Sequence, residues 1–388
     1  MARHPETEVL HRAEGARAGA APLTTPIYNT STFVFKTAAE LEAYQRGGTD
    51  TYIYSRYANP TVQAAEEKLA VLEGADAALV TASGMAATAT ALFGLLSQGD
   101  ELVASAALYG GTTQVITSQL ARFGVATRFV TIEELAEPEQ VLGGRTRVLW
   151  FESPINPTLR CVDIRRVATA CRGRGVLAVI DNTFASPVNQ QPLALGVDLV
   201  MHSATKYLNG HSDVTAGALV GSTDLIDRLR PARKMFGGIL EPTSAYALAR
   251  GMKTLALRVA RQNETALALG HWLEADTRVA RTFYPGLPSH PDHDVAAGQM
   301  QGFGGMLCFE VTGGYEGACR FFDGLTLIQR AASLGGVESL CSLPVLTSQF
   351  GLSEEQLAVA GVTPGMVRLS VGLEHVDDLI ADLDHALG

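Results

Sequence analysis

Short apolar runs alternate with amphipathic stretches through the middle of the chain. The apolar runs are bounded by Gly, Pro or polar residues, which is typical of buried strands. They lie at residues 77–81, 101–104, 126–131, 147–152, 176–180, 199–202 and 216–220. Apolar residues at helical spacing predict helices between most of them, at residues 86–96, 110–123 and 164–172. Strands that alternate with helices predict an α/β fold whose largely parallel sheet is covered on both faces.

The pattern changes on either side of this region. Before it, Pro22, Pro26 and Pro60 interrupt the chain and predict an irregular arm. After it, Pro and Gly reappear around residues 231–245, which predicts a domain boundary. Further elements are expected as helices at residues 62–72, about 242–275 and 376–387, and as strands at 305–311 and 366–371. We therefore expect an arm at residues 1–60, a large domain at 61–241 and a smaller C-terminal domain at 242–388.

Composition excludes several classes of protein. With 388 residues, 47% of them apolar and 18% charged, the chain is typical of a globular protein with more than one domain. Its formal net charge of −10 argues against binding to nucleic acid or to an anionic membrane. The five cysteines are scattered without a C-x-x-C pair, so we expect neither a disulfide framework nor a zinc site, and no metal site is predicted.

Targeting signals are not apparent in the sequence. The charged N-terminus lacks the apolar core of a signal peptide, which predicts a cytoplasmic location. Residues 77–99 carry no charge and are long enough to span a bilayer. They contain several Thr, Ser and Gly residues, however, so we interpret them as a buried strand, a turn and a helix, and we expect no membrane partner.

Polar residues follow four of the predicted strands, at the edge where ligands of parallel sheets bind. Ser83, Gly84 and Met85 follow one strand and open a helix, where free backbone N–H groups can bind phosphate. Such a turn is also a common helix cap. Asp181 ends another strand, two residues before Thr183. Its carboxylate could keep a pyridine nitrogen protonated, although a cap or a metal ligand is the alternative interpretation.

Two further segments complete the pattern. Ser203, Thr205 and Lys206 follow a third strand; a partly desolvated lysine beside two hydroxyl groups suits a Schiff base and a phosphate, although a surface lysine is the alternative. After a fourth strand, the segment ESPINP at residues 152–157 holds Asn156 in a turn made rigid by two prolines. A phosphate site, a carboxylate for a ring nitrogen and a Schiff-base lysine together predict the cofactor pyridoxal 5′-phosphate (PLP).

Longer motifs extend this pattern along nearly the whole chain. The segment HSATKYLNGHSD at residues 202–213 is almost unaltered from the lysine signature of a known family. The other matching segments are PIY at 26–28, YSRYANPT at 54–61, LYGGT at 108–112, DNTF at 181–184, SLGG at 333–336 and VRLSVG at 367–372. The sequence thereby resembles the Cys/Met-metabolism family of PLP-dependent enzymes, which comprises cystathionine γ-synthases, cystathionine and methionine γ-lyases and homoserine-ester sulfhydrylases.

The resemblance implies a fold and a set of cofactor-binding residues. The fold is PLP-dependent transferase fold type I, like that of aspartate aminotransferase, with a seven-stranded, mostly parallel sheet and a smaller α+β C-terminal domain. Lys206 is expected to form the Schiff base and to move protons, with Tyr109 stacked on the ring and assisting proton transfer. Asp181, with Thr183 beside it, is expected to pair with the pyridine nitrogen. The expected phosphate ligands are Ser83, Gly84, Met85, Ser203 and Thr205.

The resemblance also implies contacts between subunits and with the substrate. Tyr54 and Arg56 are expected to reach the phosphate of a neighbouring subunit, so the implied active form is a homo-oligomer, typically a dimer of dimers. Arg368, with Asn156 and Ser333, is expected to bind the α-carboxylate of a small amino-acid substrate. Without the motifs, Arg56 would be interpreted as a surface ion-pair residue, Tyr109 as a core aromatic and Ser333 as part of a turn.

The family carries out either γ-elimination or γ-replacement, and three positions bear on the choice. Members that use cystathionine usually carry an Arg where this chain has Gln114 and a Glu where it has Ala332. Typical methionine γ-lyases carry a Cys where it has Gly111. The two missing charges favour a small or apolar distal group, because a second zwitterion would lack partners. We therefore expect γ-elimination from methionine or homocysteine.

Several alternatives remain open at this stage. One is γ-replacement on O-acetyl- or O-succinylhomoserine, by a sulfhydrylase or a cystathionine γ-synthase, and another is cystathionine γ-lyase activity. A PLP-binding regulator, or a chain that has lost catalysis, belongs to a different class. The presence of Lys206, Tyr109 and Arg368 argues against it.

Overall fold

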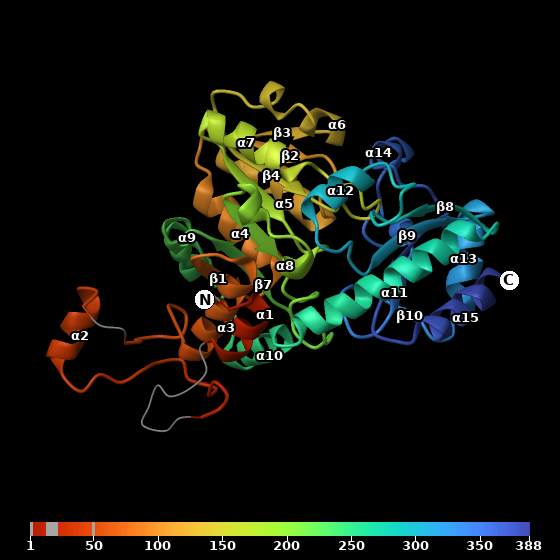
Figure 1. Ribbon diagram of the computed structural model, residues 1–388. Helices are drawn as coiled ribbons and strands as arrows, with labels where there is room; N and C mark the ends of the chain where they lie inside the picture. Colours follow the sequence, from red (N-terminus) through yellow and green to blue (C-terminus); the bar gives the residue numbers. More distant parts are fainter. Residues whose placement is uncertain (1–2, 13–21, 49–50) are drawn as a thin grey trace.

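A seven-stranded mixed sheet forms the centre of the large domain in the computed structural model, which describes residues 3–12, 22–48 and 51–388 (Figure 1). The strand order is β1-β7-β6-β5-β4-β2-β3, and β7 is antiparallel to both of its neighbours while the other pairs are parallel. The strands are β1 (Ala77–Thr81), β2 (Glu101–Ser105), β3 (Ala126–Val130), β4 (Thr146–Glu152), β5 (Leu177–Asp181), β6 (Leu199–His202) and β7 (Gly217–Gly221). All seven predicted strands are confirmed to within one residue at each end.

Helices cover both faces of this sheet. On one face, Val80, Ile180 and Val200 belong to a core shared with α3, α7 and α10. On the other face, the alternate residues Leu79 and Val179 pack with α4, α5 and α9. The helices of this part are α3 (Pro60–Glu73), α4 (Gly84–Leu95), α5 (Gly110–Ser118), α6 (Ile132–Leu135), α7 (Ile164–Arg174), α8 (Ser186–Asn189), α9 (Thr223–Phe236) and α10 (Pro242–Met252), with short 3₁₀ turns η1 (Leu120–Phe123), η2 (Pro138–Gln140) and η3 (Pro192–Leu195). Burial on both faces explains why the strands are continuous apolar runs.

The predicted long helix at residues 242–275 is wrong, because the structure divides it into α10 and α11 (Leu255–Ala275). The Arg258 side chain donates from Nη2 to the carbonyl of Gly251 at 2.8 Å, which satisfies a backbone group where α10 ends. Buried residues of α10 belong to the same core as α3. The later turns of α11 pack into the C-terminal domain (Figure 1). The boundary at residue 241 stays a prediction, and this packing favours a boundary within α11.

A five-stranded sheet organises the C-terminal domain, in the order β10-β11-β12-β9-β8. Its strands are β8 (Val279–Phe283), β9 (Met306–Val311), β10 (Gln329–Arg330), β11 (Leu340–Ser342) and β12 (Met366–Ser370). Its helices are α12 (His293–Gln299), α13 (Gly314–Gly324), α14 (Glu354–Val359) and α15 (Val376–Leu387), with the 3₁₀ turn η4 (Pro344–Leu346). The predicted elements β9, β12 and α15 are confirmed. Strand β8 was not predicted, because most of its side chains are exposed or half-buried and it therefore forms no apolar run.

In its described residues, the N-terminal arm is irregular apart from two short helices, so the prediction of a wholly irregular arm is wrong there. One is α1 (Pro5–His11), whose buried Val9 packs towards α3, and the carbonyl of Val9 accepts from Lys68 Nζ at 3.0 Å. The other is α2 (Ala38–Gln45), capped by Thr37, in a segment that projects from the body of the molecule (Figure 1). Residues 1–2, 13–21 and 49–50 of the expected arm lie outside the described residues.

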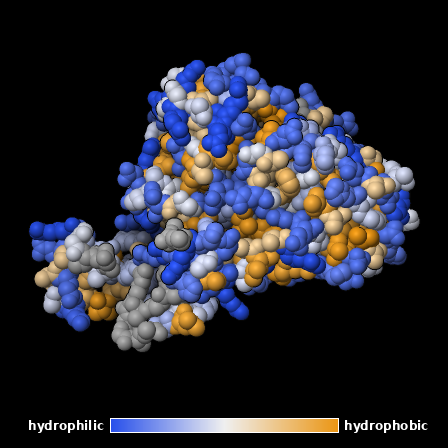
Figure 2. All heavy atoms as spheres, viewed as in Figure 1, coloured by the Kyte–Doolittle hydropathy of each residue, from blue (hydrophilic) through white to orange (hydrophobic). Residues whose placement is uncertain are grey.

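The face of the molecule seen in Figure 2 has no obvious division into apolar and polar halves, and the uncharged segment at residues 77–99 is folded into the large domain. Figure 2 shows hydrophilic and hydrophobic side chains intermixed over the body, with apolar side chains also on the projecting arm. On this arm Leu23 and Val34 are 90% and 94% exposed, values that leave them without packing partners in the isolated chain. Residues 77–99 form β1, a turn and α4, as predicted. Among the described residues, no helix combines the length and apolar character needed to cross a membrane.

We predict that Leu69→Ala lowers the free energy of unfolding by about 2–5 kcal/mol, because Leu69 on α3 is fully buried and its truncation leaves a cavity. Leu257→Ala on α11 is the matched control, since Leu257 is 76% exposed and should change stability by less than about 0.5 kcal/mol. Urea denaturation followed by circular dichroism measures both variants. Equal stability of the two variants would contradict the described core.

Candidate active site

The turn after β1 lies against the segment that follows β6. Ser83 caps α4, and its Oγ accepts from the backbone N–H of Ala86 at 3.0 Å. A Cβ added to Gly84 would lie 3.1 Å from both Cβ and Oγ of Ser203, so this close approach favours glycine. The first N–H groups of a helix have no partner within the helix. Those of Gly84 and Met85, together with the Ser203 hydroxyl, could therefore bind a phosphate group.

One oxygen of the Asp181 carboxylate is held by Thr183. Both the backbone N–H and the hydroxyl of Thr183 donate to Asp181 Oδ1, and the same hydroxyl accepts from the backbone N–H of Ser203 at 2.8 Å. Within the described residues, no hydrogen bond to Asp181 Oδ2 is found. Burial raises the pKa of Asp181, while the hydrogen bonds from Thr183 and the charge of His202 lower it. A protonated ring nitrogen beside Oδ2 would provide the partner that this carboxylate lacks.

Glu152 lies directly beside Asp181, because the two residues are partners in the pairing of β4 with β5. Its Oε1 accepts from the backbone N–H of Tyr109 at 2.6 Å. Tyr109 is the N-cap residue of α5 and is 48% exposed, which leaves the ring accessible to a ligand. The sequence analysis assigned no role to Glu152. The signal that could have found it is a carboxylate at the end of a strand buried on both faces.

Lys206 and Ser333 meet between the two domains. Lys206 Nζ donates to Ser333 Oγ at 2.9 Å. Burial and, to a lesser extent, the charge of Arg368 lower the pKa of Lys206. A larger fraction of this amine is therefore uncharged at neutral pH than in a free lysine, which favours its attack on a carbonyl carbon.

Arg368 on β12 is buried beside the loop that follows β4. Its Nη1 donates to Asn156 Oδ1 at 3.0 Å and its Nη2 to the carbonyl of Ser333 at 3.4 Å. Its Nε is buried and, among the described residues, has no hydrogen-bond partner. Burial lowers the pKa of Arg368. A buried guanidinium with an unpaired N–H is costly, and a ligand carboxylate would compensate it.

The profile of the family described as "Cys/Met metabolism PLP-dependent enzyme" matches residues 6–388 of the chain. The chain belongs to this family. It is accordingly a PLP-dependent enzyme of sulfur amino-acid metabolism with fold type I. Ser83, Asp181 and Lys206 have the chemistry to hold the phosphate, the ring nitrogen and the aldehyde of that cofactor, and these roles stay predictions.

Named relatives and solved structures of this family are similar over almost the whole chain. Cystathionine gamma-synthase 1, chloroplastic, of Arabidopsis thaliana is 43% identical over 94% of this chain, which spans 65% of that protein's length. L-methionine gamma-lyase of Pseudomonas putida is 42% identical over 98% of this chain and 96% of that protein. The crystal structure of cystathionine gamma-lyase from Lactobacillus plantarum has a TM-score of 0.91 at 38% identity and covers 99% of this chain and 98% of that chain. The predicted cytoplasmic location stays a prediction, since the plant relative is described as chloroplastic.

Three of the predicted cofactor ligands, Tyr54, Arg56 and Thr205, make contacts in this chain that do not involve the other predicted phosphate ligands. Arg56 donates from Nη1 to the carbonyl of Lys234 at 3.2 Å, and its guanidinium lies 5.7 Å from the centre of the Tyr54 ring. Arg56 thus contacts both Tyr54 and α9. The Thr205 hydroxyl accepts from the backbone N–H of Ala216 at 2.9 Å and donates to its carbonyl at 3.1 Å. The phosphate roles of these three residues stay predictions.

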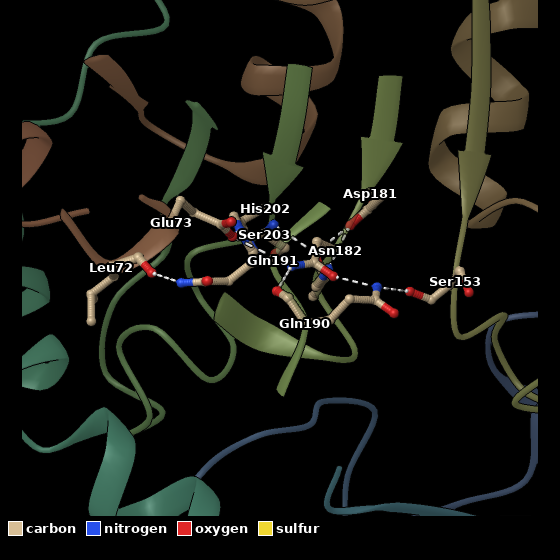
Figure 3. A network of polar contacts seen from close by, with 10 residues as sticks. Leu72, Glu73, Ser153, Asp181, Asn182, Gln190, Gln191, His202 and Ser203 are labelled. Carbon is tan, nitrogen blue, oxygen red and sulfur yellow. Dashed lines mark hydrogen bonds and ion pairs between the residues drawn. The ribbon is translucent and has the colours of Figure 1, made fainter. Parts of the chain in front are cut away.

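A buried polar network lies behind the PLP-enzyme site and joins the loops that follow β4, β5 and β6 (Figure 3). His202 Nε2 lies 2.5 Å from Glu73 Oε1, and both side chains are almost completely buried. Gln190 Nε2 donates to Asn182 Oδ1 and to the carbonyl of Ser153, each at 2.8 Å. Because every member has a buried partner, the network fixes the relative positions of these loops.

We predict that Thr183→Val weakens PLP binding about tenfold, because it removes the hydroxyl that donates to Asp181 and accepts from Ser203. Thr183→Ser keeps that hydroxyl and should bind PLP within about threefold of the wild type, which corresponds to less than about 0.7 kcal/mol. Titration of the apoenzyme with PLP, followed by absorbance, measures both dissociation constants. Unchanged affinity in Thr183→Val would contradict the role of this hydroxyl.

Proposed function

We propose that the protein catalyses γ-elimination from L-methionine or L-homocysteine and releases a thiol, ammonia and 2-oxobutanoate. The observation that carries this proposal is the distribution of charge around the substrate. Arg368 offers one buried, unpaired N–H for a single carboxylate. Gln114 on α5 and Ala332, which adjoins Ser333 at the site, provide no charge for a second amino-acid moiety. A small apolar distal group is therefore the best match.

The α-carboxylate of the substrate binds to Arg368 in this proposal. Asn156 Oδ1 accepts from Nη1 and so keeps the guanidinium plane in one orientation. The unpaired Nε is then available to one carboxylate oxygen, so that the substrate completes the hydrogen bonding of a buried cation. Ser333 contacts both Arg368 and Lys206, which places the bound substrate beside the reactive amine.

Proton transfer is assigned to Lys206 and Tyr109. When bound, PLP supplies the electron sink that stabilises negative charge at the α-carbon. Lys206 Nζ, once free and uncharged, removes the α-proton, passes it on and so becomes uncharged again, and then removes a proton from Cβ. The sulfur takes up a proton as its bond to Cγ breaks, so that it leaves as a thiol. Tyr109 stacks on the ring and assists this transfer. Asp181 remains ionised and keeps the ring nitrogen protonated, with Thr183 holding its Oδ1.

The phosphate group is assigned to the turn that opens α4 and to the segment that follows β6. We assign it to the backbone N–H groups of Gly84 and Met85 and the hydroxyls of Ser83 and Ser203, and the close approach of Gly84 to Ser203 supports this assignment.

The second candidate is γ-replacement on O-acetyl- or O-succinylhomoserine, by sulfhydrylase or cystathionine γ-synthase chemistry. Its support is the similarity to the plant cystathionine γ-synthase, which is as high as that to the methionine γ-lyase. Cystathionine γ-lyase activity is a third candidate, supported by the likeness to the Lactobacillus plantarum structure. The three differ in whether a second nucleophile is consumed and in the charge of the distal group.

We predict that the PLP-loaded enzyme releases 2-oxobutanoate from L-methionine or L-homocysteine without added thiol, and at least about tenfold more slowly from L-cystathionine, whose second zwitterion lacks charged partners. The substrates are offered separately, with O-acetyl-L-homoserine as a fourth, and 2-oxobutanoate is measured. Reaction with the ester alone, diverted to homocysteine by added sulfide, would overturn the elimination proposal. As a matched control, the double variant Gln114→Arg with Ala332→Glu should shift the preference towards cystathionine.

We further propose that the enzyme is a homo-oligomer in which Tyr54 and Arg56 reach the phosphate site of a neighbouring subunit. The arm that carries them projects from the body (Figure 1), and it exposes Leu23 and Val34. Exposed apolar side chains on a projecting segment are typical of an intersubunit contact. Neither residue contacts Lys206 or Asp181 of its own chain in the described structure.

Co-expression of two inactive variants tests this arrangement. Lys206→Ala and Arg56→Ala should each be inactive or nearly so. In a hybrid dimer, one site receives both substitutions and the other receives neither, so an equal mixture should regain about a quarter of wild-type activity. Separately purified proteins that are assayed together without subunit exchange are the control. No recovery in verified hybrids would show that Arg56 does not serve a neighbouring site.

A further inference from the structure

Two carboxyl groups lie side by side at the carboxyl edge of the sheet. Glu152 ends β4 and Asp181 ends β5, and the two are direct partners in the parallel pairing. They lie on the same face as Trp150 and Val179, which pack with α4 and α5. Asp181 faces the cofactor in the proposed site, whereas Glu152, which is 5% exposed, has been given no function.

Glu152 also determines where Tyr109 lies. Its Oε1 accepts from the backbone N–H of Tyr109 at 2.6 Å, and no side chain caps α5 at this position. On the other side, the Tyr109 ring rests against the first turn of its own helix. A Cβ added to Gly111 would lie 2.6 Å from Tyr109 Cε1 and 2.9 Å from Met85 Sδ. The ring is therefore positioned by the Glu152 carboxyl through the backbone and by Gly111 and Met85 through packing.

The two carboxyls differ in how well their charged forms are stabilised. Asp181 receives two hydrogen bonds from Thr183 on one oxygen. Glu152 receives the single N–H of Tyr109. Two adjacent buried carboxyls share one negative charge at much lower cost than they carry two. Burial and the charge of Asp181 raise the pKa of Glu152 well above its ordinary value. The larger number of hydrogen bonds to Asp181 therefore favours the negative charge on Asp181 and the proton on Glu152.

We propose that Glu152 is an uncharged positioning residue, which holds Tyr109 over the cofactor ring and leaves Asp181 as the single negative charge beside the ring nitrogen. The inference rests on the proposed roles of Asp181 and Tyr109. It adds a physical link between them, since one carboxyl group contacts the backbone of the stacking residue and adjoins the carboxylate that faces the ring.

Two substitutions distinguish the length of the Glu152 side chain from its ability to carry a charge. Glu152→Gln removes the ionisable group but keeps a side-chain oxygen at the same distance from the Tyr109 N–H. Glu152→Asp keeps the carboxyl group but is shorter by one methylene, so it does not reach this N–H. Glu101→Gln is the matched control, because Glu101 begins β2 at the opposite edge of the same sheet and accepts from Thr146 Oγ1 at 2.6 Å.

The readouts are the dissociation constant of PLP, the visible circular dichroism of bound PLP and the separate values of kcat and KM. We expect Glu152→Gln to keep kcat within about threefold of the wild type, with the same dichroism. We expect Glu152→Asp to lower kcat about 100-fold, more than it raises KM. Without the hydrogen bond to its backbone, the Tyr109 ring shifts relative to the cofactor ring, and a small misplacement of this kind slows the reaction strongly. The dichroism of Glu152→Asp should change as well, and Glu101→Gln should match the wild type throughout.

Other results overturn the proposal in distinguishable ways. Wild-type kcat and dichroism in Glu152→Asp would show that Glu152 does not position Tyr109. A loss in Glu152→Gln as large as that in Glu152→Asp would show that its charge is required. The dichroism of bound PLP needs no substrate, so it tests Glu152 even if the enzyme proves to catalyse γ-replacement instead of γ-elimination. Thermal unfolding of all three variants identifies any loss that comes from stability alone.

Discussion

Helices cover both faces of the seven-stranded sheet, and this constraint decides where chemistry can occur. A strand that is buried on both faces offers its ends to ligands, and in a mostly parallel sheet the carboxyl ends of most strands meet at one edge. Ser83, Glu152, Asp181 and Ser203 all stand at that edge. The antiparallel strand β7 is inserted between β1 and β6 and contributes Gly217, where an added Cβ would lie 2.1 Å from the carbonyl of Ser83.

The site brings together buried charges that are only partly compensated within the chain. Asp181 and Glu152 form an acidic pair on the sheet, while Lys206 and Arg368 provide basic groups on the side of the C-terminal domain. Burial disfavours the ionised form of each group, which is the common cause of their shifted pKa values. A cofactor with a phosphate, an aldehyde and a basic ring nitrogen, followed by a substrate carboxylate, supplies the missing partners. The buried ionisable groups that have few partners within the chain are therefore the groups that determine which ligands bind.

The periodicity of apolar residues predicted the seven strands of the main sheet closely, because each is a short run buried on both faces. It failed where burial is partial or where backbone contacts intervene. The largely unburied strand β8 leaves no apolar run. At the division between α10 and α11, the guanidinium of Arg258 donates to the carbonyls of Tyr207 and Gly251. Helical spacing alone gives no sign of such a contact.

The sequence by itself determined the cofactor and the family, because the residues that are predicted to bind PLP lie in short motifs directly after strands. Tertiary structure decided how remote segments meet. Arg368 contacts Asn156 across 212 positions of the chain, and Lys206 contacts Ser333 across 127. It also decided that the Thr205 hydroxyl bonds to the backbone of Ala216 and that the Glu152 carboxyl group accepts from the backbone N–H of Tyr109. Local patterns record which residues are buried, whereas the choice of partner among buried polar groups depends on the packing of whole domains.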